Sequence, residues 1–494
     1  MGDGRTVRLV LITVASALVG SFQIYNQAIV NNLVPAFAPW LAAVQVGGDV
    51  DFDWYWSLVV AAYPFGKFLG TLISGKLADG LGRINALALD STLLLIGGLS
   101  TLLSGGLRSV WTLIFGRALI GVAAGIGWIV GALLIAEITT VKNRGSILSI
   151  LGICFGVGVA SGTALSLPKL LGTTRLWPLA MSLGAFIGAP IFIALPFFIP
   201  ESPRHLILMR NNCSEGVDSI LFYQGEMHVT NTVEDLIEER EKYVDRGGRL
   251  ARDSAYWRAL FLSCLLMAAN VLVGVTVFIS FGTLIMQSAG FSYQTASYLS
   301  LFFASMEITS VLPMTVFVDA YGRRPLIIYG YAFSAVTTFF LAVMISMPPS
   351  TTQQLAILIS LGIAWISTAL PCAAGACVVT ELFPQTTRAE GMVISRSFMW
   401  LLNAITAATF LPTYRLFGAF WATSPFFIGT CIIVIILHYI LPETKGKTFA
   451  EIANQLTEPE HHQLLDQSTI SFECYQTSNM YRCSFDSDFS SSTY

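Results

Sequence analysis

The chain has 494 residues, of which 54% are hydrophobic and only 12% are charged, and its mean hydropathy is +0.68. Soluble globular domains carry about 25% charged residues, so this composition excludes an ordinary soluble domain and predicts a polytopic membrane protein within a lipid bilayer. The formal net charge of −3 gives no support for a nucleic-acid partner.

Twelve apolar stretches are each long enough to cross a bilayer, for which about 20 residues suffice. The first begins after a charged start and runs past Gly20 without a clear cleavage site, so we interpret it as a retained span rather than a signal peptide. The predicted spans are 9–33, 57–77, 86–106, 111–136, 146–167, 177–199, 258–286, 294–317, 326–346, 354–379, 391–412 and 420–440.

Basic residues between these spans are concentrated on one side of the membrane. That side holds Arg5, Arg8, Lys76, Arg83, Lys142, Arg144, the segment 201–257, Arg323, Arg324, Arg388, Lys445 and Lys447, whereas the other holds only Arg108, Lys169, Arg175 and Arg415. The excess of positive charge faces the cytoplasm in membrane proteins. Both termini are therefore predicted to be cytoplasmic.

Three motifs occur twice, in the same order and at nearly one offset. "ADGLGR" (78–83) recurs as "DAYGRR" (319–324), "AEITTVKNRG" (136–145) as "TELFPQTTRAEG" (380–391), and "PESPR" (200–204) as "PETKG" (442–446). Because six spans is an even number, the two copies share one orientation, as in the parallel repeats of major facilitator transporters.

The expected fold is therefore all-α, with twelve transmembrane helices in two six-helix repeats. We expect an N-terminal bundle (1–200), a cytoplasmic helical linker (201–257), a C-terminal bundle (258–441) and a cytoplasmic tail (442–494) that is disordered after about residue 457.

The duplicated motifs place acidic and basic residues at the cytoplasmic helix ends. We predict that they form ion pairs that latch the inner side of the two bundles, the alternative being that they only mark topology and anchor helix ends. The predicted gate residues are Asp79, Arg83, Glu137, Arg144, Glu201, Arg204, Asp319, Arg323, Arg324, Glu381, Arg388 and Glu443.

The motifs resemble those of a known family. "GKLADGLGR", "GRALIG" (116–121), "PESPRHL" and "PETKGKTFAEI" resemble the sugar porters of the major facilitator superfamily, and "GSFQIYNQAIVN" (20–31) and "RLWPLAMS" (175–182) resemble animal facilitative glucose transporters (solute carrier family 2). The resemblance covers residues 9 to 456. It implies two six-helix bundles around a central cavity, alternating access, and a sugar or polyol as the solute.

The resemblance also implies where a sugar would bind. It places Trp400 and Asn403 on one face of the eleventh span, and Asn270 on the seventh, where Thr276 replaces an asparagine. Amides and an aromatic face suit sugar hydroxyls and rings. Asn26 stands where proton-coupled relatives carry an aspartate, so a uniporter is the simpler prediction.

Four ionisable residues lie deep inside predicted spans: Lys67, Arg117, Glu307 and Arg396. Arg117 belongs to the family motif, but the other three are unexpected there. Lys67 lies 12 residues before Asp79, and Glu307 lies 12 before Asp319, so the two occupy equivalent positions in the two repeats.

Arg396 lies on the same helical stripe as Trp400 and Asn403, at spacings of four and seven residues. It is the repeat counterpart of Gly152, where the family usually has a sugar-binding glutamine. Several sugar-contacting positions are thus altered together.

These charges admit four interpretations. In the first, Lys67, Glu307 and Arg396 form a buried cluster that sets selectivity for a neutral polar solute. In the second, the surplus positive charge binds an anion such as a carboxylate or urate-like molecule. In the third, Glu307 exchanges a proton during transport. In the fourth, they form an inter-helix ion pair without substrate contact.

The remaining signals are weaker. Glu460 with Leu464 and Leu465 resembles an acidic dileucine signal for trafficking adaptors, and so for cycling between the plasma membrane and endosomes or lysosomes. The eight cysteines are scattered without metal-site spacing, and there is no catalytic constellation. We therefore expect no enzyme activity, metal or cofactor, and keep a non-transporting sugar sensor as an alternative class.

Overall fold

The computed structural model describes residues 20–44, 52–139, 141–225, 229, 233, 254–383, 387–445, 447, 451–452 and 455, and it describes the backbone alone for 141–152 and 309–320. Every regular element in these ranges is helical. The predicted tail signal at Glu460, Leu464 and Leu465 lies outside the described residues.

The first half of the chain contains a helical stretch, Gly20–Asn32, that ends in the 3-10 turn η1 (Ile29–Asn32). It is followed by α2 (Val34–Val44), α3 (Phe52–Leu81), α4 (Arg83–Leu107), α5 (Val110–Ile138), α6 (Val141–Leu165), α7 (Trp177–Ala194) and η2 (Leu195–Phe197). The linker contains a π-helix, η3 (His205–Met209), and α8 (Cys213–Tyr223).

The second half contains α10 (Ser254–Leu272), α11 (Val275–Ser288), α12 (Tyr293–Tyr321), α13 (Arg323–Ser346), α14 (Thr351–Glu381), α15 (Arg388–Phe417) and α16 (Ala419–Ile440). Within the fully described residues, nine helices are long and apolar enough to cross a membrane, and a bent pair is a tenth candidate. Within the described residues, a helix lies in each of the twelve stretches that the hydropathy predicts.

Two features of these helices differ from the predicted spans. The chain bends by 76° at Leu33, between Gly20–Asn32 and α2, so a short additional helix follows the first span. The predicted seventh span breaks at Val273 and Gly274, where Gly274 has a φ of +83° that favours glycine. The break separates α10 from α11.

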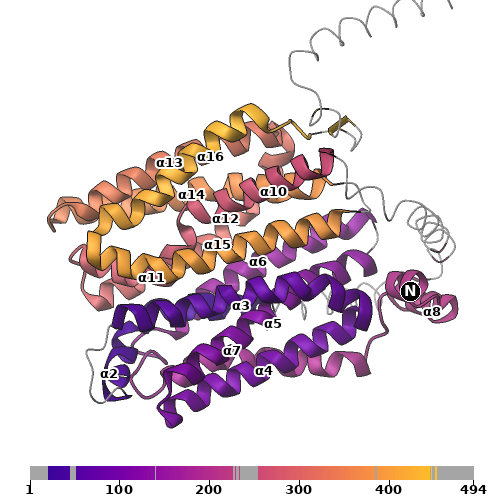
Figure 1. The fold of residues 1–494 in the computed structure, drawn as a ribbon, viewed down its shortest axis with the longest axis horizontal. Coiled ribbons are helices and arrows are strands. Elements are labelled where there is room, and N and C mark those ends of the chain that lie inside the picture. The colour runs from indigo at the N-terminus through magenta and orange to yellow at the C-terminus, as the bar shows by residue number, and fades with distance from the viewer. Residues whose placement is uncertain are drawn as a thin grey trace, which may run out of the picture.

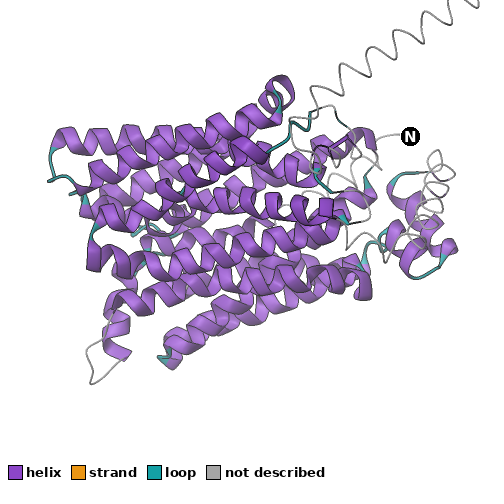
Figure 2. Cartoon of the chain, turned by 45° about the horizontal axis from the view of Figure 1, so that its top comes forward, coloured by secondary structure: helices purple, strands orange, loops and turns teal. Residues whose placement is uncertain are grey.

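The two halves lie side by side as separate groups of helices (Figure 1). Helix α3 of the first half packs along α15 of the second, and α6 packs along α12. A second view shows that the long helices run in roughly one direction through the molecule (Figure 2). The interface between the halves is therefore built mainly by these two helix pairs.

We call the end of the helices that carries Arg83, Glu137, Arg323 and Glu381 the charged end, and the other, which carries Asn31 and Thr283, the opposite end. Apolar residues of both halves, among them Trp56, Trp177, Phe281, Phe303 and Phe426, form one core cluster. The other clusters in the membrane region each belong to a single half. In this conformation the halves share a core toward the opposite end.

Glycines allow α3 and α5 to pack backbone against backbone. A Cβ at Gly66 or Gly121 would lie 2.1 Å from a carbonyl oxygen of the facing helix, and one at Gly70 would do the same. Membrane helices associate through such small residues because they gain no hydrophobic energy from leaving lipid. This close packing fixes the position of α3, and with it that of Lys67, along α5.

Candidate functional site

Lys67 and Trp400 meet where α3 of the first half faces α15 of the second. Lys67 is 1% exposed, and its Nζ lies 3.8 Å from the centre of the Trp400 ring and 5.3 Å from that of Tyr63. An ammonium group over an aromatic face is a cation–π contact. Among the described residues the Nζ atom has no hydrogen-bond partner.

Arg396 lies one turn before Trp400 on α15, the residue whose ring Lys67 contacts. The structure therefore brings together two of the three unexpected charges that the sequence places in spans. No described contact of either cation reaches a carboxylate.

Glu307 makes its described contact elsewhere, with Trp365 of α14. The Trp365 Nε1 donates a 2.8 Å hydrogen bond to a Glu307 carboxylate oxygen. Phe303, one turn earlier on α12, stacks on the Trp365 ring with the centroids 6.2 Å apart. The single cluster of Lys67, Glu307 and Arg396 that we predicted is thus not seen in the described contacts, and the role of each residue stays a prediction.

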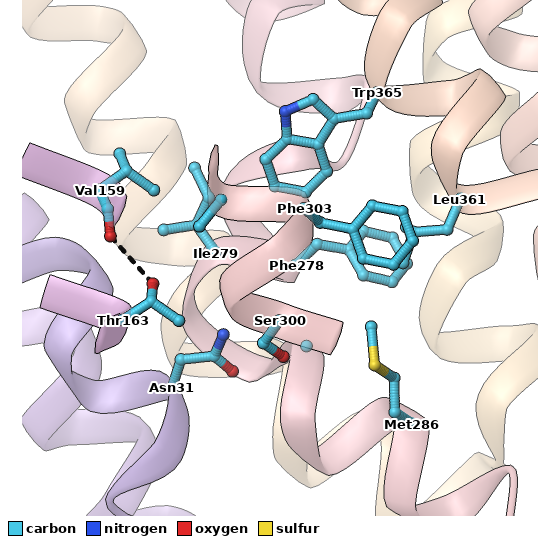
Figure 3. Close-up of a pocket in the computed structure, with 12 residues that line it drawn as sticks. Asn31, Val159, Thr163, Phe278, Ile279, Met286, Ser300, Phe303, Leu361 and Trp365 are labelled. Atoms are coloured by element: carbon cyan, nitrogen blue, oxygen red, sulfur yellow. Dashed lines mark hydrogen bonds between the residues drawn. The ribbon is translucent and has the colours of Figure 1, made fainter. Parts of the chain in front are cut away.

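A small cavity opens beside Trp365, between the two halves (Figure 3). The first half contributes Asn31, Val159 and Thr163, and the second contributes residues of α11, α12 and α14. The lining combines the polar side chains of Asn31, Thr163 and Ser300 with the apolar side chains of Phe278, Ile279, Met286, Phe303, Leu361 and Trp365.

Hydrogen bonds across the halves close the opposite end beside this cavity. The Asn31 Oδ1 accepts from the backbone N–H of Thr283 at 2.9 Å, and the Thr283 hydroxyl donates to the Asn32 Oδ1 at 2.5 Å. The Tyr293 hydroxyl donates to the Asn32 carbonyl at 2.6 Å. At the same end Arg415 lies 3.5 Å from Asp53.

The predicted first-span residue Asn26 is fully buried, and its Nδ2 donates to the Phe22 carbonyl at 3.0 Å. Its Oδ1 has no hydrogen-bond partner among the described residues, and neither does the Oε1 of Gln27. Arg117 anchors this helix by donating to the carbonyls of Asn26, at 3.2 Å, and Val59, at 2.6 Å. Two buried amide oxygens are thus left without a partner in the described part of the chain.

The other predicted binding residues are Asn403, Asn270 and Thr276. Asn403 is buried, and its backbone carbonyl accepts from the Thr406 hydroxyl. Asn270 is half-buried near the end of α10, and the Thr276 hydroxyl, just past the helix break, has no partner among the described residues. Their substrate contacts remain predictions.

Sequence reasoning missed the residues that line the cavity, and among the residues it missed are Asp90 and Trp365. Asp90, on α4, is fully buried, and its two carboxylate oxygens accept from the Gln23 Nε2 at 3.2 and 3.0 Å. A lone aspartate inside the predicted third span could have been noticed. Trp365 was missed because an apolar run gives an aromatic residue no distinguishing signal.

The predicted gate residues form a compact network in the first half. The Arg83 side chain donates two 3.0 Å hydrogen bonds to the Glu137 carboxylate, and the Ser202 hydroxyl also donates to it. Glu201 caps the start of α4 by accepting from the backbone N–H groups of Arg83 and Ile84. Asp79 lies 3.5 Å from Arg83.

The second half repeats this network at the matching positions. Arg323 donates to Glu381 at 3.2 Å, and the Thr444 hydroxyl donates to Glu381 at 2.5 Å. Glu443 caps α13 by accepting from the backbone N–H groups of Arg323 and Arg324, both at 3.1 Å. Burial alone would raise the Glu443 pKa, but these backbone donors, with those of Lys445 and Thr444, lower it overall.

His205 distinguishes the first network from the second. An Arg83 guanidinium nitrogen lies 2.9 Å from the His205 Nδ1, and because a guanidinium only donates, Nδ1 must be the acceptor and the ring neutral. The pKa of His205 is lowered, first by burial and then by the charges of Arg83 and Arg210, against the opposing effect of Glu137 and Asp79.

Each of the charge pairs described at the charged end joins helices of one half. Arg204 is half-buried, and the Arg388 Nε donates to the Phe383 carbonyl at 3.4 Å. The side chains of Arg144 and Asp319 lie outside the described residues. A latch between the bundles therefore stays a prediction, while the pairs within each half are observed.

Comparisons with known proteins agree with this architecture. The profile of a family described as "Sugar (and other) transporter" matches residues 12–456. The chain is 27% identical over 471 residues to the Equus caballus solute carrier family 2, facilitated glucose transporter member 5, covering 92% of this chain and 93% of that protein. It is 26% identical over 466 residues to the Homo sapiens member 7, with 91% and 90% covered.

Solved structures show the same fold. The partially occluded inward-open xylose transporter XylE from E. coli matches with a TM-score of 0.75 and 20% identity, covering 89% of this chain and 99% of that one. The proton:xylose symporter XylE bound to 6-bromo-6-deoxy-D-glucose matches with a TM-score of 0.74. The twelve-helix major facilitator fold is thereby confirmed, and the chain belongs to the sugar (and other) transporter family, as a multi-pass membrane transporter rather than an enzyme.

Proposed function

We propose that this protein carries a small polyhydroxylated solute, such as a hexose or a related polyol, across the membrane by facilitated diffusion. The family and the relatives named as facilitated glucose transporters support this solute class. The observation that carries the proposal is the cavity between the halves, which presents hydrogen-bonding side chains opposite an aromatic wall.

The chemistry of this cavity suits a sugar. A pyranose ring has an apolar face that packs on an aromatic ring, and hydroxyl groups that need donors and acceptors. The stacked rings of Phe303 and Trp365 offer the first, and Asn31 and Ser300 offer the second. The oxygens of Asn26 and Gln27, which have no partner among the described residues, are further acceptors on the first span.

Alternating access explains how the solute leaves this site. The opposite end is closed by hydrogen bonds between the halves, through Asn31, Asn32 and Thr283. Each of these bonds contributes about 0.5–1.5 kcal/mol, a range that thermal motion and ligand binding can overcome. Opening the opposite end while the charged end closes would expose the cavity to the other side.

The remaining proposals concern location. From the charge pattern we propose that the charged end and both termini face the cytoplasm, and that the protein resides in the plasma membrane. Glu460, Leu464 and Leu465 would bind trafficking adaptors that cycle it through endosomes or lysosomes.

A transport assay in proteoliposomes tests the proposed function. Radiolabelled hexoses, inositol, ascorbate and urate are offered at pH 5.5 and 7.5, with the wild type compared with Trp365→Ala and with Trp421→Ala. Trp421 is 63% exposed on the outer surface of α16 and serves as the matched control.

We expect saturable, pH-insensitive uptake of a neutral sugar or polyol. Trp365→Ala should raise KM by about tenfold, because loss of the aromatic face that packs on the sugar should cost about 1.4 kcal/mol of binding free energy, and Trp421→Ala should match the wild type. Binding without flux for every solute would instead favour the sensor. Uptake that accelerates at pH 5.5 would point to proton coupling.

A further inference from the structure

We propose that Lys67 and Arg396 form an anion-binding site on the transport path, one that accepts the carboxylate of a hydroxylated acid such as a sugar acid. The inference rests on the transport function proposed above and extends its solute class from neutral sugars to a hydroxylated acid. The two residues belong to different halves of the molecule, on α3 and α15.

The first argument is the uncompensated charge. The Lys67 Nζ is buried and has no hydrogen-bond partner among the described residues. It lies 3.8 Å from the centre of the Trp400 ring, and a second cation, Arg396, lies one turn before Trp400 on α15. A charge held at membrane depth is costly unless it is paired or hydrogen-bonded. The contact with the Trp400 ring offsets only part of that cost. A bound anion would neutralise both cations at once.

The second argument is that the protein's own carboxylates are engaged elsewhere. Glu307 accepts from Trp365, which lies on α14, and Asp90 accepts from Gln23 within the first half. Neither makes a described contact with Lys67 or Arg396. An anion that compensates these cations is therefore expected to come from outside the chain.

The surroundings indicate what kind of anion fits. A guanidinium donates two parallel hydrogen bonds to a carboxylate, and an ammonium adds a third donor. Trp400 offers a ring face to Lys67, and Asn403 lies three residues further along the same face of α15. Together they match a small molecule with a carboxylate at one end and hydroxyls at the other.

The position between the halves gives the anion a mechanical role. Because Lys67 moves with the first half and Arg396 with the second, an anion held by both bridges them when they are close. Separation of the two helices would divide the site and release the anion. Binding and the change of access would then be coupled through one ligand.

The test compares two probes that differ by one charge, glucose and glucuronate, in proteoliposomes held at pH 7.5. Uptake is measured for the wild type, Lys67→Met, Arg396→Met and the matched control Lys76→Met, whose lysine is exposed on the same helix α3. Methionine keeps most of the unbranched apolar part of the side chain and removes its charge.

We expect the wild type to take up glucuronate with net movement of negative charge. Lys67→Met and Arg396→Met should each lower the ratio of glucuronate to glucose uptake by about tenfold or more, the loss expected for one charge-assisted contact, while Lys76→Met leaves that ratio unchanged. The assignment to an organic acid would be overturned if the ratio were unaltered in both site variants. It would also be overturned if the wild type neither took up nor bound glucuronate.

The same chemistry admits an inorganic anion as the ligand. Glucose uptake is therefore measured again with chloride replaced by methanesulfonate. A dependence of glucose uptake on chloride that Lys67→Met abolishes would assign the site to chloride as a co-transported ion. Independence from chloride, with glucuronate uptake intact, would assign it to the organic acid.

A binding measurement separates this inference from the proposed function. Glucuronate, chloride and glucose are each tested for protection of the detergent-solubilised protein against thermal unfolding. Protection by an anion that Lys67→Met removes, without flux of any solute, would keep the site and overturn transport. Flux of glucose without any effect of anions would keep transport and overturn the site.

Discussion

Single side chains in this protein have roles that depend on which neighbours they meet. Lys67 and Glu307 occupy equivalent positions in the repeats, yet Lys67 lies against an aromatic ring of the other half and Glu307 accepts from an indole of its own half. The same divergence occurs at the charged end, where His205 enters the first network and Lys447 stands at the matching place in the second.

His205 predicts a pH dependence of stability. The pKa of His205 is lower in the folded state than in the unfolded state, so the unfolded chain binds more protons. The stability that neutral His205 supports is therefore complete above its unfolded pKa of about 6.5. This stability is lost as the pH falls through the lower folded-state pKa. The melting temperature should therefore fall between pH 7.5 and 5.5, and less so in His205→Gln.

The control for this experiment is His438→Gln, which removes an exposed histidine at the end of α16. It should leave the pH dependence of the wild type in place. Equal pH dependence in the wild type and His205→Gln would show that protonation of His205 does not destabilise the network.

At the scale of elements, helix packing depends on where glycine lies. A Cβ at Gly121 on α5 would meet the Tyr63 carbonyl of α3, whereas a Cβ at Gly131 on the same helix would have no described atom within 4 Å. The sequence contains both glycines in similar apolar surroundings. Only the contact between α3 and α5 tells them apart.

Replacing Gly121 with alanine should destabilise the protein by about 1–3 kcal/mol, because the new Cβ would lie 2.1 Å from a backbone oxygen and the helices must separate. Gly131→Ala should be neutral or stabilise by about 0.5–1 kcal/mol, since alanine favours the helix. Thermal unfolding in detergent measures both, and an equal effect of the two changes would contradict the packing argument.

At the scale of the whole molecule, the halves are held together at the opposite end by a few polar contacts. Helix α11 is separated from α10 by the break at Gly274, and it carries Thr283 to Asn31 and Asn32 of the first half. This places a short helix, separated from α10 by the break, at the closed entrance of the cavity.

Thr283→Val should shift the population toward a conformation with this end open. The change removes the hydroxyl bonds to Asn32 and Ser300 and leaves a buried amide oxygen without this donor, a loss of about 1–3 kcal/mol. A cysteine introduced at the cavity residue Met286 should then react faster with an impermeant maleimide added from that side. Thr409→Val, at an exposed position, is the control. An unchanged rate of maleimide reaction in Thr283→Val would show that the Thr283 hydroxyl bonds do not keep this end closed.

The sequence alone determined the number of spans and the duplication, because membrane spans are read from local hydropathy and the duplication from motifs that recur along the chain. It also predicted charged residues at the helix ends, which the structure pairs within each half, while a latch between the bundles stays a prediction. Arg83 contacts both Glu137 and Glu201, and its repeat counterpart Arg323 contacts both Glu381 and Glu443. These contacts join the ends of helices, and the recurring motifs already give the order of those helices along the chain.

Only the tertiary structure decided which buried charges meet. The repeat places Lys67 and Glu307 at similar depth, and spacing places Arg396 on the helical stripe of Trp400, but the direction in which each side chain points depends on how each helix rotates against its neighbours. That rotation is set by contacts distant in sequence, such as Gly66 against Ala118 and Trp365 against Glu307. The contact of Lys67 with Trp400, one turn from Arg396, follows from it, and so does the proposed anion site.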